Sequence, residues 1–233
     1  MGGPSAAPVD GRGLFAIAFR QPPRFDPGAA FDYNNANTLL LGKVVERGSG
    51  QPLRAYIHER ILAPAGLART SFPVGAKFPA PHPHGYWRTP EGVIVDTTDW
   101  NTSWGGAAGQ MVSTLDDLRI WARDLATGTL LTPATQQQRE RFLLAPDEGQ
   151  GVVYGLGMTD NNGWRGHDGN VLGYVTYPFY LPARQTTLVV LLNSSVDVLD
   201  SVAVMQAITR VIAPDNVWPT NPPPAPATAT PAA

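Results

Sequence analysis

The stretch "GHDGNVLGYVTYPFYLPARQTTLVVLLNSS", residues 166–195, contains two long apolar runs with a short turn between them. The first run, residues 171–182, is rich in the aromatic and β-branched side chains that favour strands. The second, residues 186–195, is apolar enough for a central strand buried on both faces. A shorter strand is expected upstream at residues 152–158, "VVYGLGM". Strands separated by such turns indicate an antiparallel sheet of at least three strands.

Helices are predicted before and after this strand-rich region in the sequence. Four segments carry apolar residues at helical spacing: residues 35–50, 52–67, 113–128 and 200–213. The first stops at a pair of glycines, and the second ends at Pro64 and Gly66. For the third, Ser113 or Thr114 is the expected N-cap, with an aspartate three residues on.

The last helix and a long irregular segment complete the expected fold. The helix at residues 200–213 carries an apolar stripe that we expect to pack on the sheet: Val202, Met205, Ile208 and Ile212. Residues 73–92 are dominated by proline and glycine, which predicts an irregular excursion with room for one hairpin. The expected fold class is α+β, an antiparallel sheet with flanking helices.

Composition narrows the classes of function. The chain has 233 residues, of which 43% are hydrophobic and 15% charged, enough for one globular domain with a core. A net charge of -2 gives no basic surface, so nucleic acid and anionic membranes are not expected partners. The absence of cysteine excludes disulfides and thiolate metal sites. No apolar run has the length of a membrane span.

Both ends of the chain are expected to lie outside the fold. Residues 1–9 lack the regions of a signal peptide and are expected to be disordered or an arbitrary start. Residues 214–233 form a Pro/Ala-rich tail that is expected to be disordered. The folded unit is therefore expected to span residues 10–213.

Three stretches occur in an order that resembles a known family. They are "PRFDPGAAFDYNNANTLLLG" (23–42), "GGAAGQMVSTLDDLRIWA" (105–122) and "YGLGM…GHDGNVLGYVT…LVVLLNSS" (154–195). Together they resemble the penicillin-recognising serine hydrolases: class C β-lactamases, serine DD-peptidases, and related esterases and D-aminopeptidases. That family carries the motifs Ser-x-x-Lys, Tyr-x-Asn and Lys/His-x-Gly. The corresponding motifs of class A β-lactamases and penicillin-binding proteins are Ser-x-x-Lys, Ser-Asp-Asn and Lys-Thr-Gly. The resemblance covers residues 10–212 and implies part of a β-lactamase/transpeptidase-like fold.

The resemblance assigns roles to residues at two of the three motifs. Tyr33 and Asn35 match Tyr-x-Asn, and His167 and Gly169 match His-x-Gly at the start of a strand. Tyr33 would be the general base, His167 would help to hold it ionised, and Asn35 and Gly169 would bind substrate. The backbone N–H of Asn170 would donate to the oxyanion. The alternative for His167 is a strand-edge histidine that only caps a turn.

The chemistry explains why a tyrosine base needs cationic neighbours. A phenol has a pKa of about 10, so a phenolate at neutral pH requires a shift of about 3 units, or about 4 kcal/mol. Nearby positive charge or strong hydrogen-bond donors supply such a shift. In the family these are the Ser-x-x-Lys lysine and the third-motif side chain, which here is His167.

The nucleophile motif is missing from these 233 residues. Lys43 and Lys77 are the two lysines of the chain, and the residues three positions before them are Leu40 and Val74. None of the eight serines lies in Gly-x-Ser-x-Gly or at a diagnostic spacing from a base.

We therefore expect the chain to be the C-terminal portion of a serine hydrolase, inactive alone. Its expected partners are a small-molecule or peptide substrate (an ester, a D-amino-acid peptide or a β-lactam) and a missing N-terminal segment. The alternatives are a non-catalytic binding module of the same fold and an inactive gene fragment. The family is usually exported, although this chain shows no signal peptide.

Asp168 departs from the family pattern. The middle position of the third motif usually carries Thr or Ser, whose hydroxyl helps to receive a substrate carboxylate. A carboxylate there would repel another by about 1 kcal/mol or more, which favours neutral esters or amine-bearing substrates over β-lactams. Two alternatives stay open: Arg165 could neutralise Asp168, or Asp168 could point to solvent.

The sequence predicts neither a cofactor nor a metal site. His82 and His84 form a pair, but their proline-rich setting offers no third ligand, so a loop at the cleft mouth is the preferred interpretation. Four aromatic residues could either wall the cleft or pack in the core: Tyr86, Trp87, Trp100 and Trp104.

Overall fold

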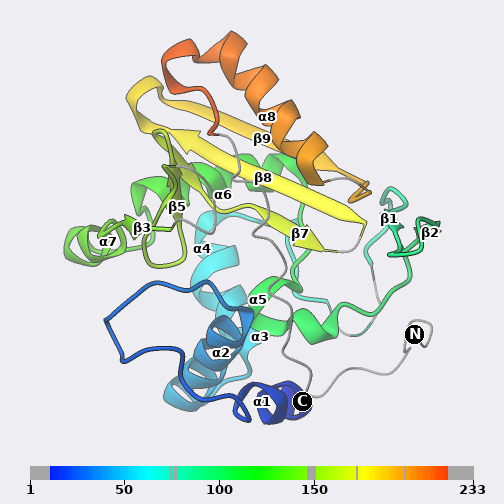
Figure 1. The fold of residues 1–233 in the computed structure, drawn as a ribbon. Coiled ribbons are helices and arrows are strands. Elements are labelled where there is room, and N and C mark those ends of the chain that lie inside the picture. Colours follow the sequence, from blue (N-terminus) through cyan, green and yellow to red (C-terminus); the bar gives the residue numbers. More distant parts are fainter. Residues whose placement is uncertain are drawn as a thin grey trace.

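A computed structural model describes residues 11–73, 75, 78–145, 151–171, 173–196 and 198–219 of the chain. It shows a sheet with one helix on each face and a group of helices beside it (Figure 1). This is the α+β fold with an antiparallel sheet that the sequence predicts. The expected N-terminal segment 1–9 lies outside the described residues.

The group of helices comes from the N-terminal part of the chain. It contains α1 (Gly11–Ala18), α2 (Asn35–Ser49), α3 (Leu53–Ile57), the π-helical turn His58–Leu62 and α4 (Ala63–Ala65). The side chain of Asn34 caps α2 by accepting from Ala36 N at 2.8 Å. Gly66 ends α4 in the left-handed conformation, whereas Pro64 lies inside that last turn rather than ending it.

The middle of the chain supplies a hairpin and three further helices. The hairpin pairs β1 (Tyr86–Arg88) with β2 (Ile94–Asp96). The irregular region predicted at residues 73–92 contains β1, whereas β2 lies just beyond it. The remaining elements are the 3₁₀ turn Ser103–Gly105, α5 (Gly106–Gly109), α6 (Leu115–Thr127) and α7 (Pro133–Arg139). Of the two N-cap candidates for α6, Thr114 has this role, because its side chain accepts from Asp117 N.

Seven strands make up the large sheet of the described residues. They are β3 (Leu143–Leu144), β4 (Val153–Tyr154), β5 (Thr159–Asn161), β6 (Trp164–Gly166), β7 (Gly169–Val171), β8 (Tyr174–Leu181) and β9 (Thr186–Leu192). Strands β3 to β6 form a meander, and β6 and β7 both pair with β8. The strand that borders β8 is thus interrupted at His167 and Asp168.

The position of β9 differs from the expected central strand. Among the described residues β9 pairs with β8 alone, so it lies at an edge of the sheet. Helix α6 contacts it on one face, and Leu188, Val190 and Leu192 pack against the core on the other. None of its residues is fully buried. The apolar run predicted burial on both faces, and both faces of β9 are covered, but its residues stay partly exposed because no second strand lies beside it.

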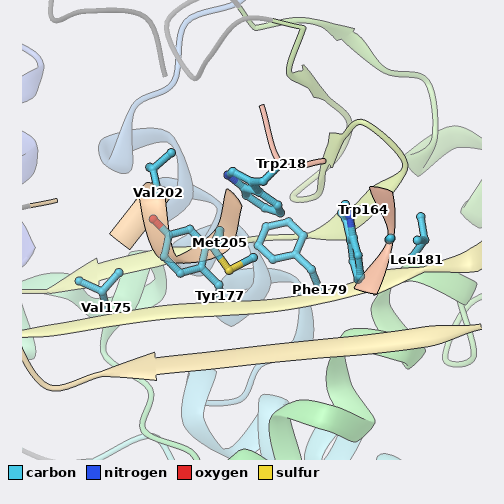
Figure 2. Close-up of a cluster of buried hydrophobic side chains, with 9 residues drawn as sticks. Trp164, Val175, Tyr177, Phe179, Leu181, Val202, Met205 and Trp218 are labelled. Carbon is cyan, nitrogen blue, oxygen red and sulfur yellow. The ribbon is translucent and has the colours of Figure 1, made fainter. Parts of the chain in front are cut away.

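The core lies between β8 and α8 (Val198–Ile212). Figure 2 shows Val175, Tyr177 and Phe179 on one face of β8, pointing toward Val202 and Met205 of the helix. This alternation along β8 follows from the two-residue period of a strand.

The apolar stripe predicted for α8 is confirmed at its first two residues and wrong at its last. Val202 and Met205 are buried, but Ile212 is 39% exposed and Thr209 is fully buried in its place. Thr209 Oγ1 bonds to Met205 O and accepts from Trp218 N, which gives this buried hydroxyl its partners.

The folded region extends beyond the expected boundary at residue 213. A 3₁₀ turn at Pro214–Asn216 leads to Trp218, which is 6% exposed and packs edge-on against Phe179 with ring centroids 4.6 Å apart. Trp164 Nε1 donates to Asn216 O at 2.7 Å. Residues 214–218 are therefore part of the fold, while residues 220–233 of the expected tail lie outside the described residues.

The turn between β7 and β8 should be highly sensitive to a side chain at Gly173. This residue has a φ of +91°, and a Cβ there would overlap Thr97 Oγ1 and lie 2.9 Å from Gly85 C. We expect Gly173→Ala to lower the free energy of unfolding by about 2–5 kcal/mol, measured by urea denaturation. Gly157→Ala is the matched control, because Gly157 has a φ of +70° but open space around it. Equal losses from the two variants would contradict the prediction.

Candidate active site

The two motifs from distant parts of the sequence meet at one place in the fold. Tyr33 directly precedes the N-terminus of α2, and His167 lies in the break between β6 and β7. Their ring centroids are 5.9 Å apart. Asn35, on the first turn of α2, accepts from Tyr33 Oη through its Oδ1 at 3.4 Å. The structure therefore brings Tyr33, Asn35 and His167 into one cleft.

Local structure fixes the direction of both motifs. The N-cap residue Asn34 lies between Tyr33 and Asn35, so its cap fixes where both motif residues leave the start of α2. Gly166, just before His167, has no room for a side chain, because a Cβ there would overlap Pro178 O and approach Phe179 Cδ1 to 2.7 Å. The glycine lets β6 lie close against β8, and the chain leaves the sheet immediately afterwards.

A second tyrosine, which sequence reasoning missed, contacts His167. Tyr154 Oη lies 2.7 Å from His167 Nε2, and His167 Nδ1 lies 2.7 Å from Asp168 O. In the meander Tyr154 pairs with Thr159, and Thr159 pairs with Gly166. This register, which the sequence does not specify, aligns Tyr154 with the residue before His167.

Aromatic rings pack around the imidazole. The ring of Tyr154 lies 5.5 Å from that of His167 in an edge-on arrangement and 5.8 Å from that of Tyr33. On its other side Tyr154 contacts Phe31 at 5.1 Å. The rings of Tyr33 and Tyr154 thus contact His167 directly, and Phe31 supports Tyr154 from behind.

A cavity of about 1080 Å³ opens beside these residues. It extends from Tyr33 and Asn35 across α2 and α6 to Asn170 on β7 and Leu191 on β9. Gly169 also lines it. Among the described residues that line it, only His167 and Asp168 have side chains that can carry a charge near neutral pH. The cavity is therefore a largely apolar space with one acidic group at its polar end.

The four aromatic residues considered for the cleft wall divide into two groups. Trp100 and Trp104 line the cavity, whereas Tyr86 and Trp87 are not among its described lining residues. Trp87 instead packs edge-on against Trp100, with centroids 5.9 Å apart.

Arg165 does not neutralise Asp168. Its guanidinium pairs with Glu140 at 3.1 Å and with Asp160 at 3.2 Å, and it lies over the Phe142 ring. Alternation along β6 points Arg165 away from the face that carries Trp164. Asp168 lines the cavity with a side chain that is 43% exposed, and its Oδ1 lies 3.9 Å from His167 Nδ1. The carboxylate is thus available to a ligand in the cavity.

The histidines of the proline-rich loop have partners within the protein. His84 Nδ1 lies 2.6 Å from Asp96 Oδ2, and His82 stacks on Phe78. Hydrogen bonds from the Thr98 hydroxyl and backbone N–H, together with His84, lower the pKa of Asp96 to about 2. Among the described residues no cluster of three potential ligands could hold a metal ion.

Tyr174 also lines the cavity. Its Oη donates to Pro83 O at 2.9 Å, and burial raises the pKa of its phenol. Tyr174 therefore stays neutral and serves as a structural donor.

None of the helices that the structure describes has the length and apolar character needed to cross a bilayer.

Comparison with known proteins identifies the family. A sequence model of the family described as Beta-lactamase matches residues 2–208. The chain belongs to the Beta-lactamase family. A D-aminopeptidase of Cereibacter sphaeroides is 27% identical to this Beta-lactamase family chain over 184 residues, which is 76% of the chain and 34% of the relative. The chain thus spans about a third of the length of this curated relative.

Solved structures support the same Beta-lactamase family fold. A D-stereospecific amidohydrolase from Streptomyces sp. matches with a TM-score of 0.74 and 28% identity, covering 80% of this chain and 57% of that one. A penicillin-binding protein from Bacillus halodurans matches in fold, with a TM-score of 0.72 and 23% identity, covering 88% and 65% of the two chains. The penicillin-recognising serine hydrolase fold expected from the sequence is confirmed.

Proposed function

We propose that this chain supplies the base, the substrate-binding strand and most of the cleft of an acyl-transfer hydrolase. The observation that carries the proposal is the meeting of Tyr33 and Asn35 with His167 beside a large cavity. Hydrolysis through a serine ester needs a nucleophile, a base, a proton donor to the leaving group and oxyanion donors. The proposal assigns the base, the proton donor and one oxyanion donor to described residues, and it assigns the nucleophile, whose own N–H is the second oxyanion donor, to another segment.

Each residue has a defined role in this proposal. Tyr33 removes the proton from the attacking hydroxyl and returns it to the leaving group. The ring centroid of His167 lies 5.9 Å from that of Tyr33. The protonated imidazole supplies positive charge that favours the phenolate form of Tyr33. Asn35 binds the acyl amide, Gly169 lets the substrate approach β7, and the backbone N–H of Asn170 donates to the oxyanion.

The proposed nucleophile comes from a polypeptide segment outside these 233 residues. The 1080 Å³ cavity and the one-sided pairing of β9 leave surface for a packing partner. Leu41 and Val44 on α2, which are not among the described cavity residues, are also 62% and 59% exposed. Such a segment would bring Ser-x-x-Lys next to Tyr33. Reading the gene in frame upstream of Met1 for that motif is the simplest test, and a reading frame closed immediately before Met1 would count against a segment in cis.

The proposed substrate is an ester or amide whose acyl part carries a free amine. Asp168 is the acidic side chain of the cavity, and Arg165 is committed elsewhere. A β-lactam or peptide carboxylate would meet repulsion there, whereas an ammonium group would be attracted. The names of two relatives, a D-aminopeptidase and a D-stereospecific amidohydrolase, agree with a D-amino-acid substrate.

Asp168→Asn provides a direct test of this preference in the protein joined to its nucleophile segment. We expect kcat/KM for D-phenylalanine amide to fall about fivefold, because an attraction of about 1 kcal/mol is lost. The N-acetylated substrate should be unaffected. Asp116→Asn is the control, since Asp116 is exposed on α6 and is not among the described cavity residues. A similar fall with both substrates would contradict amine recognition.

A further inference from the structure

The contact between Tyr154 and His167 defines the protonation of the imidazole. His167 Nδ1 lies 2.7 Å from the backbone oxygen of Asp168. A carbonyl oxygen can only accept, so Nδ1 carries the hydrogen of this bond. In the neutral ring Nε2 is then an acceptor, and the group 2.7 Å from it is the Tyr154 hydroxyl. Tyr154 therefore donates to Nε2.

The tyrosine is itself held in place. It belongs to β4, which pairs with β5, and its ring lies between Phe31 and the Tyr33–His167 pair. The side chain is only partly exposed. A donor on a strand, packed between rings, has few alternative orientations, so the imidazole that it contacts is held in one orientation.

We propose that Tyr154 is a positioning residue for His167. It fixes the Nδ1–H tautomer and the ring plane that His167 presents to Tyr33. The proposed function is needed only for the step in which the orientation of His167 affects Tyr33 as a base. The hydrogen-bond geometry that carries it involves described residues alone.

The pair also accommodates a proton without moving. When His167 gains a proton, it enters at Nε2, because Nδ1 already carries one. The bond then reverses: Nε2–H donates to Tyr154 Oη, and the phenolic hydrogen turns to another acceptor. No bond other than N–H is formed, and the charge stays on the imidazolium. Positive charge thus develops beside Tyr33 while both ring nitrogens keep their partners.

Nitrogen NMR of the histidine-labelled chain tests the proposal without any catalysis. The chain has four histidines, and His167→Gln assigns the signal of interest. At pH 8 we expect the His167 signals of an Nδ1–H tautomer. In Tyr154→Phe the ratio of Nδ1–H to Nε2–H should fall about two- to tenfold, the effect of one hydrogen bond.

The control removes the hydroxyl of Tyr174, a tyrosine that lines the cavity beside His167. Tyr174→Phe deletes a phenol that bonds to Pro83 O and not to His167, so the tautomer ratio should not change. An equal shift in both variants would indicate general loosening and overturn the proposal. An Nε2–H tautomer in the unsubstituted chain would overturn the proposal as well. The tautomer of the unsubstituted chain can be measured even if Tyr154→Phe does not fold. Failure of the hydrolase proposal would leave these signals unaffected, so the two failures are distinguishable.

Discussion

The 233-residue chain alone is expected to produce no acyl-enzyme and to hydrolyse neither nitrocefin nor short-chain nitrophenyl esters above background. The family mechanism requires a serine and a lysine that this sequence does not contain at the required spacing. Loss of a serine nucleophile costs about a million-fold in kcat in a well-studied protease, and loss of one oxyanion donor about a hundred-fold or more. Stopped-flow burst kinetics and labelling with a fluorophosphonate probe would measure the effect.

Adding the missing chemistry should reverse this result. An N-terminal segment with Ser-x-x-Lys, from the upstream frame or from a structural relative, is expected to restore fluorophosphonate labelling when it is fused or co-expressed. The same segment with its serine changed to alanine is the control, because it differs from the active segment only in the nucleophile. A burst of acyl-enzyme from the chain alone would show that one of its eight serines is a nucleophile and would contradict the proposal.

Tyr33→Phe is expected to lower kcat of the protein joined to its nucleophile segment by about 10²–10⁴-fold, the usual contribution of a general base. KM should change little, because the ring and its contact with Tyr154 remain. Steady-state kinetics with an amide substrate would give both constants.

The exposed position of Tyr33 allows a close control for that variant. Tyr33 is 38% exposed and Tyr86 is 39% exposed, but Tyr86 is not among the described residues of the cavity. Tyr86→Phe should therefore leave both kinetic constants unchanged. Activity of Tyr33→Phe within tenfold of the unsubstituted protein would assign the base to another group, and the nearest phenol is Tyr154.

Local sequence patterns determined much of the fold. The aromatic and β-branched side chains of 171–182 predicted a strand there, and β8 occupies residues 174–181 of that run. Helical spacing and capping residues predicted α2 and α6, and Asn34, Thr114 and the glycines after each helix act within a few residues of where they stand. Such interactions are short-range and remain visible in the sequence.

The candidate site was accessible from the sequence only through family resemblance. Tyr33 and His167 carry no local signal that would separate them from an ordinary exposed tyrosine and a strand-edge histidine. Their spacing relative to the other family stretches suggested a common site, and the fold brings them together. Tyr154 begins the third of those stretches but belongs to none of the three catalytic motifs, so its contact with His167 emerged only from the register of three paired strands.

Tertiary structure alone decided several features. It placed β9 at an edge, brought Trp218 back over Phe179, buried Thr209 in place of Ile212, and turned Arg165 to Glu140 and Asp160. Each depends on which distant segment lies opposite, and that choice is made by the summed burial of apolar surface and the pairing of charged groups. The sequence by itself determined the elements, the apolar faces and the family motifs. The fold determined their neighbours, because those contacts join residues whose separation along the chain carries no information about their distance in space.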